Sequence, residues 1–125
     1  MTGCVQVLIV DDQPRARQGL KALLATWPLV REIKEAANGK EALAFVEKSL
    51  PDLVLMDVRM PEMDGLEATR QIKAKWPQVK IVALSMYADY AADALVAGAD
   101  AFICKGESPE KLLATLGAVV ADRPQ

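Results

Sequence analysis

Short apolar segments recur along the chain and predict β-strands. Four of them are rich in β-branched residues or continuously apolar, at residues 5–10, 53–56, 80–84 and 101–104. Segments of this kind are typical of strands that are covered on both faces, as in a parallel sheet. Residues 31–36 are a fifth and weaker candidate. The pattern therefore predicts five strands.

The segments between these strands follow the period of an α-helix. The first has a single apolar stripe with the spacing i, i+4, i+7, i+8 and i+11, formed by Ala16, Leu20, Leu23, Leu24 and Trp27. The charged side chains Arg15, Arg17 and Lys21 lie opposite this stripe. An amphipathic helix with its charged side away from the core is predicted.

Capping residues mark the beginnings of two further helices. Asn38 is followed three residues later by Glu41, which resembles a capping box, and the buried side of this helix is predicted to be Ala42, Leu43 and Val46. Before the last helix, Ser108 can cap and Pro109 suits the first turn. Its apolar face is predicted to be Leu112, Leu113, Leu116, Val119 and Val120.

Strands and helices alternate strictly, with short joints between them. Parallel neighbouring strands need crossover connections, and those connections are right-handed, so helices cover both faces of the sheet. The predicted fold class is α/β, a doubly wound parallel sheet of five strands. No repeat or interdomain linker divides the sequence, and we expect one domain over residues 1–125.

Acidic and other polar residues follow the predicted strands. Asp11 and Asp12 follow the first, Asp57 the third, Ser85 the fourth and Lys105 the fifth. Ligands of an open parallel sheet bind beyond the carboxyl ends of its strands, so these side chains are expected to meet. Three carboxylates in one place repel each other unless a cation lies among them. Oxygen ligands favour Mg²⁺, with Mn²⁺ as an alternative.

Composition excludes several classes of function. The 125 residues contain no histidine, which excludes Ser-His-Asp and Cys-His catalysis and histidine-bound zinc. A phosphohistidine, if one takes part, must belong to another protein. Fifteen basic and 17 acidic side chains give a net charge of -2, which does not favour a nucleic-acid surface. The start lacks a charged signal region and the apolar segments are too short to span a bilayer, so we expect a cytoplasmic protein.

Several segments resemble the receiver domain of bacterial response regulators. They are Val10-Asp11-Asp12, Asp57-Val58-Arg59-Met60-Pro61-Glu62-Met63-Asp64-Gly65, Ala83-Leu84-Ser85 and Phe102-Ile103-Cys104-Lys105. Residues 97–102, with Lys105-Gly106 and Ser108-Pro109-Glu110, are most similar to the NarL/FixJ (LuxR-type) branch. The resemblance implies a flavodoxin-like (CheY-like) sheet with strand order 2-1-3-4-5 and five helices. It also implies two-component signalling, with a sensor histidine kinase as phosphoryl donor.

The resemblance assigns roles to the residues at the sheet edge. Asp57 is expected to be the phosphoacceptor, and to hold Mg²⁺ together with Asp12 and the backbone carbonyl of Arg59, while Asp11 acts through water. Lys105 and Ser85 are expected to bind phosphoryl oxygens. The domain would thus catalyse only its own phosphorylation and autodephosphorylation and would not otherwise be an enzyme.

The resemblance also predicts a conformational switch. Ser85 is expected to move toward the phosphoryl group, and Phe102 to turn into the space it vacates, which changes the face made by the fourth helix, fifth strand and fifth helix. Members of this branch usually carry a DNA-binding module after the receiver. We expect no such output domain within these 125 residues, and we expect contact with DNA and control of transcription only through one. Phosphorylation is also expected to favour a homodimer, with its interface left open.

Two features depart from the family pattern or vary within it. Ser85 and Lys105 are 20 positions apart, about two fewer than is usual. A short helix that begins near Asp89 and ends before Gly98 is therefore predicted. Arg59 and Tyr87, each two positions beyond a site residue, are placed to flank the attacking water and are predicted to alter autodephosphorylation.

Three alternatives remain open from the residues alone. A pseudo-receiver would keep the fold for protein contacts only. A small Mg²⁺-dependent aspartyl phosphatase would also use an aspartate nucleophile, although its family motif is Asp-x-Asp and here the pair is contiguous. A flavodoxin-like nucleotide-binding protein is disfavoured because no glycine-rich loop follows Val10.

Overall fold

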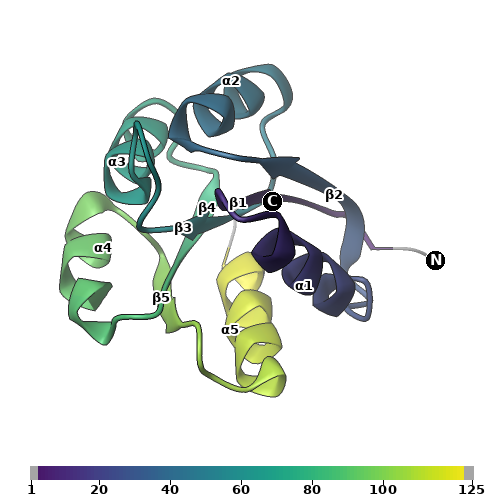
Figure 1. The fold of residues 1–125 in the computed structure, drawn as a ribbon. Coiled ribbons are helices and arrows are strands. Elements are labelled where there is room, and N and C mark those ends of the chain that lie inside the picture. Colours follow the sequence, from purple (N-terminus) through teal and green to yellow (C-terminus); the bar gives the residue numbers. More distant parts are fainter. Residues whose placement is uncertain (1–2, 123–125) are drawn as a thin grey trace.

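A five-stranded parallel sheet organises the chain, with the order β2-β1-β3-β4-β5 (Figure 1). The computed structural model describes residues 3–122, so the ends of the predicted 1–125 domain lie outside the described residues. The elements follow one another as β1 (Val5–Val10), α1 (Pro14–Leu24), β2 (Val30–Ala36), α2 (Gly39–Ser49), β3 (Leu53–Asp57), α3 (Gly65–Lys75), β4 (Lys80–Ser85), η1 (Ala88–Tyr90), α4 (Ala91–Ala97), β5 (Ala101–Cys104) and α5 (Pro109–Ala121). The predicted fold class and strand order are confirmed.

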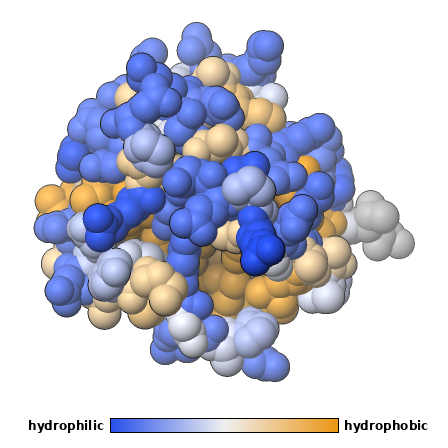
Figure 2. Space-filling model, viewed as in Figure 1, coloured by the Kyte–Doolittle hydropathy of each residue, from blue (hydrophilic) through white to orange (hydrophobic). Residues whose placement is uncertain are grey.

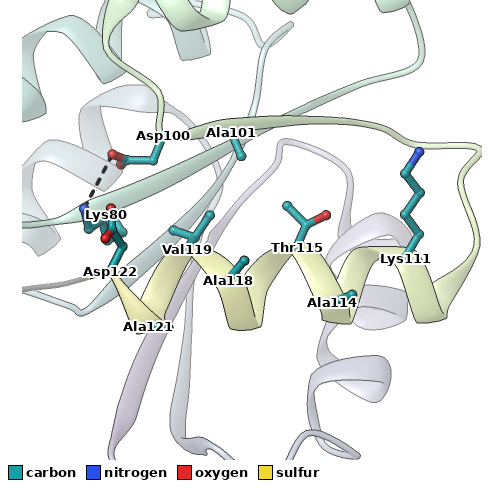
Figure 3. Close-up of a pocket in the computed structure, with 10 residues that line it drawn as sticks. All are labelled: Lys80, Asp100, Ala101, Lys111, Ala114, Thr115, Ala118, Val119, Ala121 and Asp122. Atoms are coloured by element: carbon teal, nitrogen blue, oxygen red, sulfur yellow. Dashed lines mark ion pairs between the residues drawn. The ribbon is translucent and has the colours of Figure 1, made fainter.

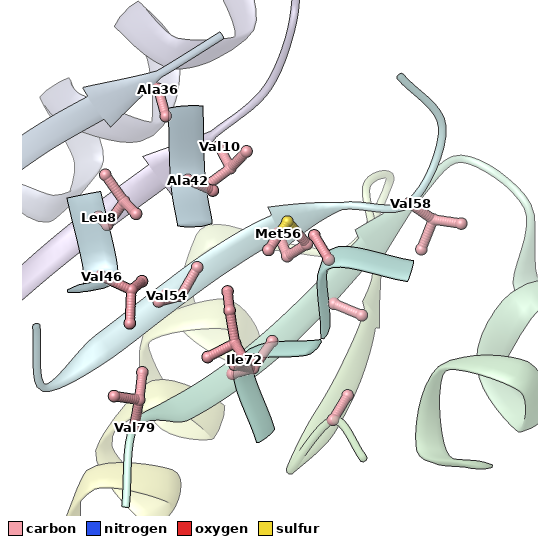
Figure 4. Packing of buried hydrophobic residues seen from close by; sticks show 14 of the residues in the cluster. Leu8, Val10, Ala36, Ala42, Val46, Val54, Met56, Val58, Ile72 and Val79 are labelled. Carbon is pink, nitrogen blue, oxygen red and sulfur yellow. The ribbon is translucent and has the colours of Figure 1, made fainter. Parts of the chain in front are cut away.

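Helices cover both faces of the sheet, as Figure 1 shows. One hydrophobic core lies under α2, α3 and α4 and includes Val54, Met56 and Ile72 (Figure 4). The other lies under α1 and α5 and includes Leu55 and Leu116. Alternate residues of β3 thus face opposite cores, which explains its continuous apolar sequence. Within residues 3–122, no helix is both long and apolar enough to cross a bilayer.

Strand lengths differ from the prediction by one residue at some ends. β1 and β5 have the predicted bounds, whereas β3 and β4 each extend one residue further, to Asp57 and Ser85. Both added residues are in register with the next strand, Asp57 opposite Leu84 and Ser85 opposite Cys104. The two polar side chains are therefore fixed by the sheet itself.

Side-chain caps define the beginnings of several helices. Asn38 accepts a hydrogen bond from the Glu41 backbone N–H at 2.9 Å, and Glu41 accepts one from the Ala37 N–H at 2.8 Å. Ser108 caps α5 through the Lys111 N–H at 3.2 Å. The predicted starts of α2 and α5 are confirmed.

The first helix is shorter than its apolar stripe. α1 ends at Leu24, and Trp27 lies beyond it in the turn before β2. Trp27 is nevertheless buried in the same core as Leu24. The prediction that Trp27 belongs to the helix is therefore wrong. A turn can bury a side chain on the same side as the helix before it, so the spacing of buried residues alone does not show where the helix ends.

The joint between β4 and β5 is compact, and α4 is held unequally at its two ends. No side-chain cap is present at Tyr87 or Tyr90, which precede η1 and α4. At the other end Gly98 has a left-handed conformation, with φ 111°, and Asp100 accepts hydrogen bonds from the Ile81 N–H at 2.8 Å and Lys73 Nζ at 3.1 Å. The predicted short helix ending before Gly98 is confirmed.

Candidate functional site

Three carboxylates meet at the carboxyl edge of the sheet. β1 and β3 are neighbours, and the register Val10 opposite Met56 brings the following residues, Asp11 and Asp57, side by side. One carboxylate oxygen from each of Asp11, Asp12 and Asp57 lies within 4.8 Å of the others. Asp11 and Asp57 are 1% and 6% exposed, so water can screen their charges only weakly.

Lys105 joins this cluster from the far side of the sheet. Its backbone N–H donates to the Ser85 carbonyl at 2.8 Å, which continues the pairing of β5 with β4. Its ammonium nitrogen lies 3.0 Å from Asp11 Oδ2 and 3.1 Å from Asp57 Oδ1. The structure thus brings together Asp11, Asp12, Asp57 and Lys105, four of the residues that were singled out in the sequence.

The charges in the cluster shift two pKa values. Burial, followed by repulsion from Asp11, raises the pKa of Asp57 to about 6, although the hydrogen bond from Lys105 opposes this. Burial lowers the pKa of Lys105, but hydrogen bonds to Asp11 and Asp57, together with the negative charges of these two carboxylates, outweigh burial and raise it overall. A single ammonium therefore does not balance three carboxylates, and the site favours an additional cation.

The donor set fits a hard divalent ion. The cluster offers carboxylate oxygens and, among the described residues, no sulfur or imidazole ligand. Mg²⁺ prefers oxygen ligands and commonly takes one or two carboxylates while it keeps several waters. Asp11, Asp12 and Asp57 are thus suited to Mg²⁺ or Mn²⁺.

Ser85 and Phe102 lie on one face of the sheet. Ser85 is buried, and its hydroxyl oxygen accepts a hydrogen bond from the Tyr87 N–H at 3.0 Å. Phe102 is opposite Ala83, two residues before Ser85, and packs half-buried against the core under α2, α3 and α4. Because the two side chains lie on the same face of neighbouring strands, a movement of Ser85 can change the space that is open to Phe102.

Arg59 and Tyr87 contact each other at the surface beside the acidic cluster. The Arg59 guanidinium carbon is 5.8 Å from the centre of the Tyr87 ring, a cation–π distance. Both side chains are exposed, and their loops directly follow Asp57 and Ser85. The two positions that were predicted to flank the site thus form one pair.

Arg17 has a role in this region that the sequence pattern did not indicate. Its place opposite the apolar stripe of α1 predicted a side chain on the solvent side. In the structure its guanidinium donates to the Asp11 backbone carbonyl at 2.6 Å and to Glu35 Oε1 at 2.9 Å. Only the approach of α1 to the end of β2 reveals this contact, because Arg17 and Glu35 are 18 positions apart.

Gly65 lets α3 begin directly against the end of β3. A Cβ atom added there would lie 2.0 Å from the Asp57 backbone oxygen. A Gly65→Ala variant is therefore expected to lose about 2 kcal/mol of unfolding free energy in urea, because backbone must move. Gly117→Ala is the control, since no atom lies within 4 Å of its added Cβ, and in the middle of α5 it should stabilise slightly. Equal stability of the two variants would contradict this explanation.

A separate groove lies between β5 and α5 and has a volume of about 640 Å³ (Figure 3). It is lined by alanines of α5 and by the ion pair of Lys80 with Asp100, and no member of the acidic cluster contributes to it. Lys80 and Ala101 are the first residues of their strands. The groove therefore reaches the opposite edge of the sheet from Asp57.

Most of this chain is similar in sequence to known proteins. The profile of the family described as "Response regulator receiver domain" matches residues 7–117. The uncharacterized transcriptional regulatory protein YhcZ of Bacillus subtilis is 41% identical over 113 residues, which cover 89% of this chain and 53% of YhcZ. The chain thus spans about half the length of the curated relatives it matches.

Solved structures agree with these relatives. A LuxR-family two-component response regulator from Aurantimonas has a TM-score of 0.90 and 31% identity, over 98% of this chain and 88% of that one. The response regulator TrrA of Thermotoga maritima, solved in complex with Mg²⁺ and BeF, has a TM-score of 0.86 and 33% identity, over 93% of this chain and 99% of that one. Together with the family match, these similarities show that the chain belongs to the receiver-domain family of two-component response regulators.

Proposed function

We propose that this receiver domain accepts a phosphoryl group on Asp57 and thereby switches a partner-binding face. The observation that carries the proposal is the cluster itself, in which Lys105 Nζ lies within 3.1 Å of both Asp11 and Asp57 while Asp12 supplies a third carboxylate. Such a site provides a nucleophile, a point charge for a phosphoryl oxygen and ligands for a divalent ion.

The donor in this proposal is a phosphohistidine of a sensor kinase in the cytoplasm. Because the chain has no histidine of its own, that phosphohistidine must belong to another protein. An oxygen of the Asp57 carboxylate attacks phosphorus, a P–O bond forms, and the P–N bond breaks with its electron pair left on the imidazole nitrogen. With a pKa of about 6, Asp57 is mostly ionised at neutral pH and so is a competent nucleophile. Lys105 then donates to a phosphoryl oxygen. No separate substrate is turned over.

The residues of the cluster fit Mg²⁺, and Mn²⁺ as an alternative. We assign Asp12, Asp57 and the Arg59 backbone carbonyl as protein ligands, with Asp11 acting through water. When bound, the ion supplies positive charge to the oxygens of the transferring phosphoryl group. The solved complex of TrrA with Mg²⁺ and BeF supports the choice of Mg²⁺ by analogy.

The proposed switch uses Ser85 and Phe102. Ser85 exchanges its hydrogen bond from the Tyr87 N–H for one that it donates to a phosphoryl oxygen, and Phe102 turns further inward. The surface affected is made by α4, β5 and α5, where Leu95 and Val96 are 53% and 85% exposed. Figure 2 shows hydrophobic atoms over α4. A partner, including a second phosphorylated copy, would bind this face with a different affinity after the switch.

The output in this proposal is transcription, and YhcZ is named as a transcriptional regulatory protein. Since this chain matches only about half of such relatives, DNA would be bound by an output domain outside the matched half.

The proposal is tested by incubating the protein with Mg²⁺ and acetyl phosphate and then measuring the intact mass of the protein. One added phosphoryl group that requires Mg²⁺ is expected. Continuous hydrolysis of phosphomonoesters would instead favour the aspartyl phosphatase, and neither label nor Mg²⁺ affinity would favour the pseudo-receiver.

Arg59→Asn and Tyr87→Ala are each expected to shorten the half-life of the acyl phosphate several-fold. Both variants remove bulk beside the acceptor, which opens it to water. Because the two side chains touch, the double variant should lose less than the product of the single effects. The decay of labelled protein after removal of the donor measures this. Unchanged half-lives in both single variants would exclude a role for the pair.

A further inference from the structure

Asp12 is the one member of the acidic cluster without a direct partner. Asp11 accepts from the Gln13 N–H at 2.9 Å and from Lys105, and Asp57 accepts from Lys105. The Asp12 carboxylate has no hydrogen bond or ion pair with any residue between 3 and 122. Its direction therefore depends on the backbone that carries it.

That backbone is held by Arg17. The peptide group that joins Asp11 to Asp12 presents its carbonyl oxygen to Arg17 Nη1 at 2.6 Å. Arg17 is itself fixed, because its Nε donates to Glu35 Oε1 at 2.9 Å and only 17% of its side chain is exposed. The planar guanidinium has donors to satisfy both partners at once, which a lysine ammonium does not match in geometry.

We propose that Arg17 is a positioning residue for the metal site, which holds the Asp11–Asp12 peptide so that the Asp12 carboxylate faces Asp57. The inference rests on the proposed function, because it assigns Asp12 to a site for Mg²⁺. Groups that orient metal ligands from outside the coordination sphere typically change metal affinity by tenfold or more when removed. Arg17 acts in this way through a backbone carbonyl.

The sign of the effect separates positioning from electrostatics. Removal of a positive charge near a cation site strengthens cation binding if only Coulomb's law matters. Loss of positioning weakens it. Lys21 is the matched control, since its Nζ lies 3.2 Å from the other oxygen of Glu35 and, among the described residues, it forms no hydrogen bond or ion pair with Asp11. Both residues are on α1, and both carry one positive charge.

Calorimetric Mg²⁺ titrations of the wild-type chain and of Arg17→Gln, Arg17→Lys and Lys21→Gln test the inference. Arg17→Gln is expected to bind Mg²⁺ about tenfold more weakly, Arg17→Lys to lie between it and wild type, and Lys21→Gln to stay within about twofold of wild type. Urea unfolding of each metal-free variant serves as the structural readout, because a merely structural role would lower stability without moving Mg²⁺ affinity.

If Arg17→Gln bound Mg²⁺ as tightly as wild type or more tightly, this inference would be overturned, but the proposed function would not. If the glutamine variant does not fold, Arg17→Lys decides by the same comparison with Lys21→Gln. Absence of Mg²⁺ binding by the wild-type chain would overturn the proposed function and, with it, this inference.

Discussion

Asp57→Asn is expected to take up no phosphoryl group from acetyl phosphate in the presence of Mg²⁺. The amide keeps the size of the side chain and its place at the end of β3, but its nitrogen and neutral oxygen are poor nucleophiles. The loss should therefore be complete, while the sheet register of Asp57 opposite Leu84 is retained. Intact mass before and after incubation measures the uptake directly.

Two further variants make this result specific. Glu62→Gln removes an exposed carboxylate in the loop that follows the proposed acceptor and should be labelled as fast as wild type, since among the described residues Glu62 forms an ion pair only with Lys40, at 3.8 Å. Asp12→Asn should still be labelled, but more slowly, because it removes a proposed metal ligand and leaves the nucleophile. Label that persists in Asp57→Asn would show that another side chain is the acceptor.

The unfolding free energy of the Mg²⁺-free protein should contain a contribution from Asp57 that falls by roughly 3 kcal/mol as pH rises from about 4 to about 7. Burial and Asp11 raise the pKa of Asp57 from 3.8 to about 6 in the folded protein. Between these values the folded state binds the proton more tightly than the unfolded state. Below both pKa values Asp57 is protonated in both states and does not lower the unfolding free energy. Above both values Asp57 is ionised in both states, and the unfolding free energy is lowered by the full amount.

The measurement is a series of urea unfolding curves in chelator at different pH values, for wild type and Asp57→Asn. The difference between the two proteins isolates Asp57, because Glu32, Glu35, Glu67 and Glu107 have lowered pKa values that act in the opposite direction in both. Saturating Mg²⁺ should remove most of the difference, since it stabilises the ionised carboxylate. A difference that does not vary with pH would contradict the raised pKa.

Local rules predicted the parts of this structure that local interactions determine. The caps at Asn38 and Ser108 satisfy backbone N–H groups only three residues away, so the sequence contains both partners. The apolar segment of β3 needs cover on both faces wherever it lies in the sheet. Parallel strands also place their following residues at one edge, which is why the positions of Asp11, Asp57 and Lys105 could be predicted together.

Features that depend on how distant segments pack together could not be predicted from the sequence. The helical period placed Trp27 in α1 because a periodic pattern does not mark where the backbone leaves the helix. The contact of Arg17 with the Asp11 carbonyl depends on how α1 packs against β1 and β2, and a charged residue on the polar side of a helix is more often solvated. The groove between β5 and α5 likewise arises only from the packing of these two elements.

The unequal anchoring of α4 determines which end of this helix is expected to open more readily. At its carboxyl end, Asp100 ties the turn to β4 and to Lys73 of α3, so separation there would break several bonds at once. At its amino end, η1 has no side-chain cap, and all three of its residues are exposed or only partly buried. Opening of η1 and α4 is therefore expected to begin at the residues beside Ser85, near the proposed acceptor, while the end of α4 that Asp100 anchors stays in place.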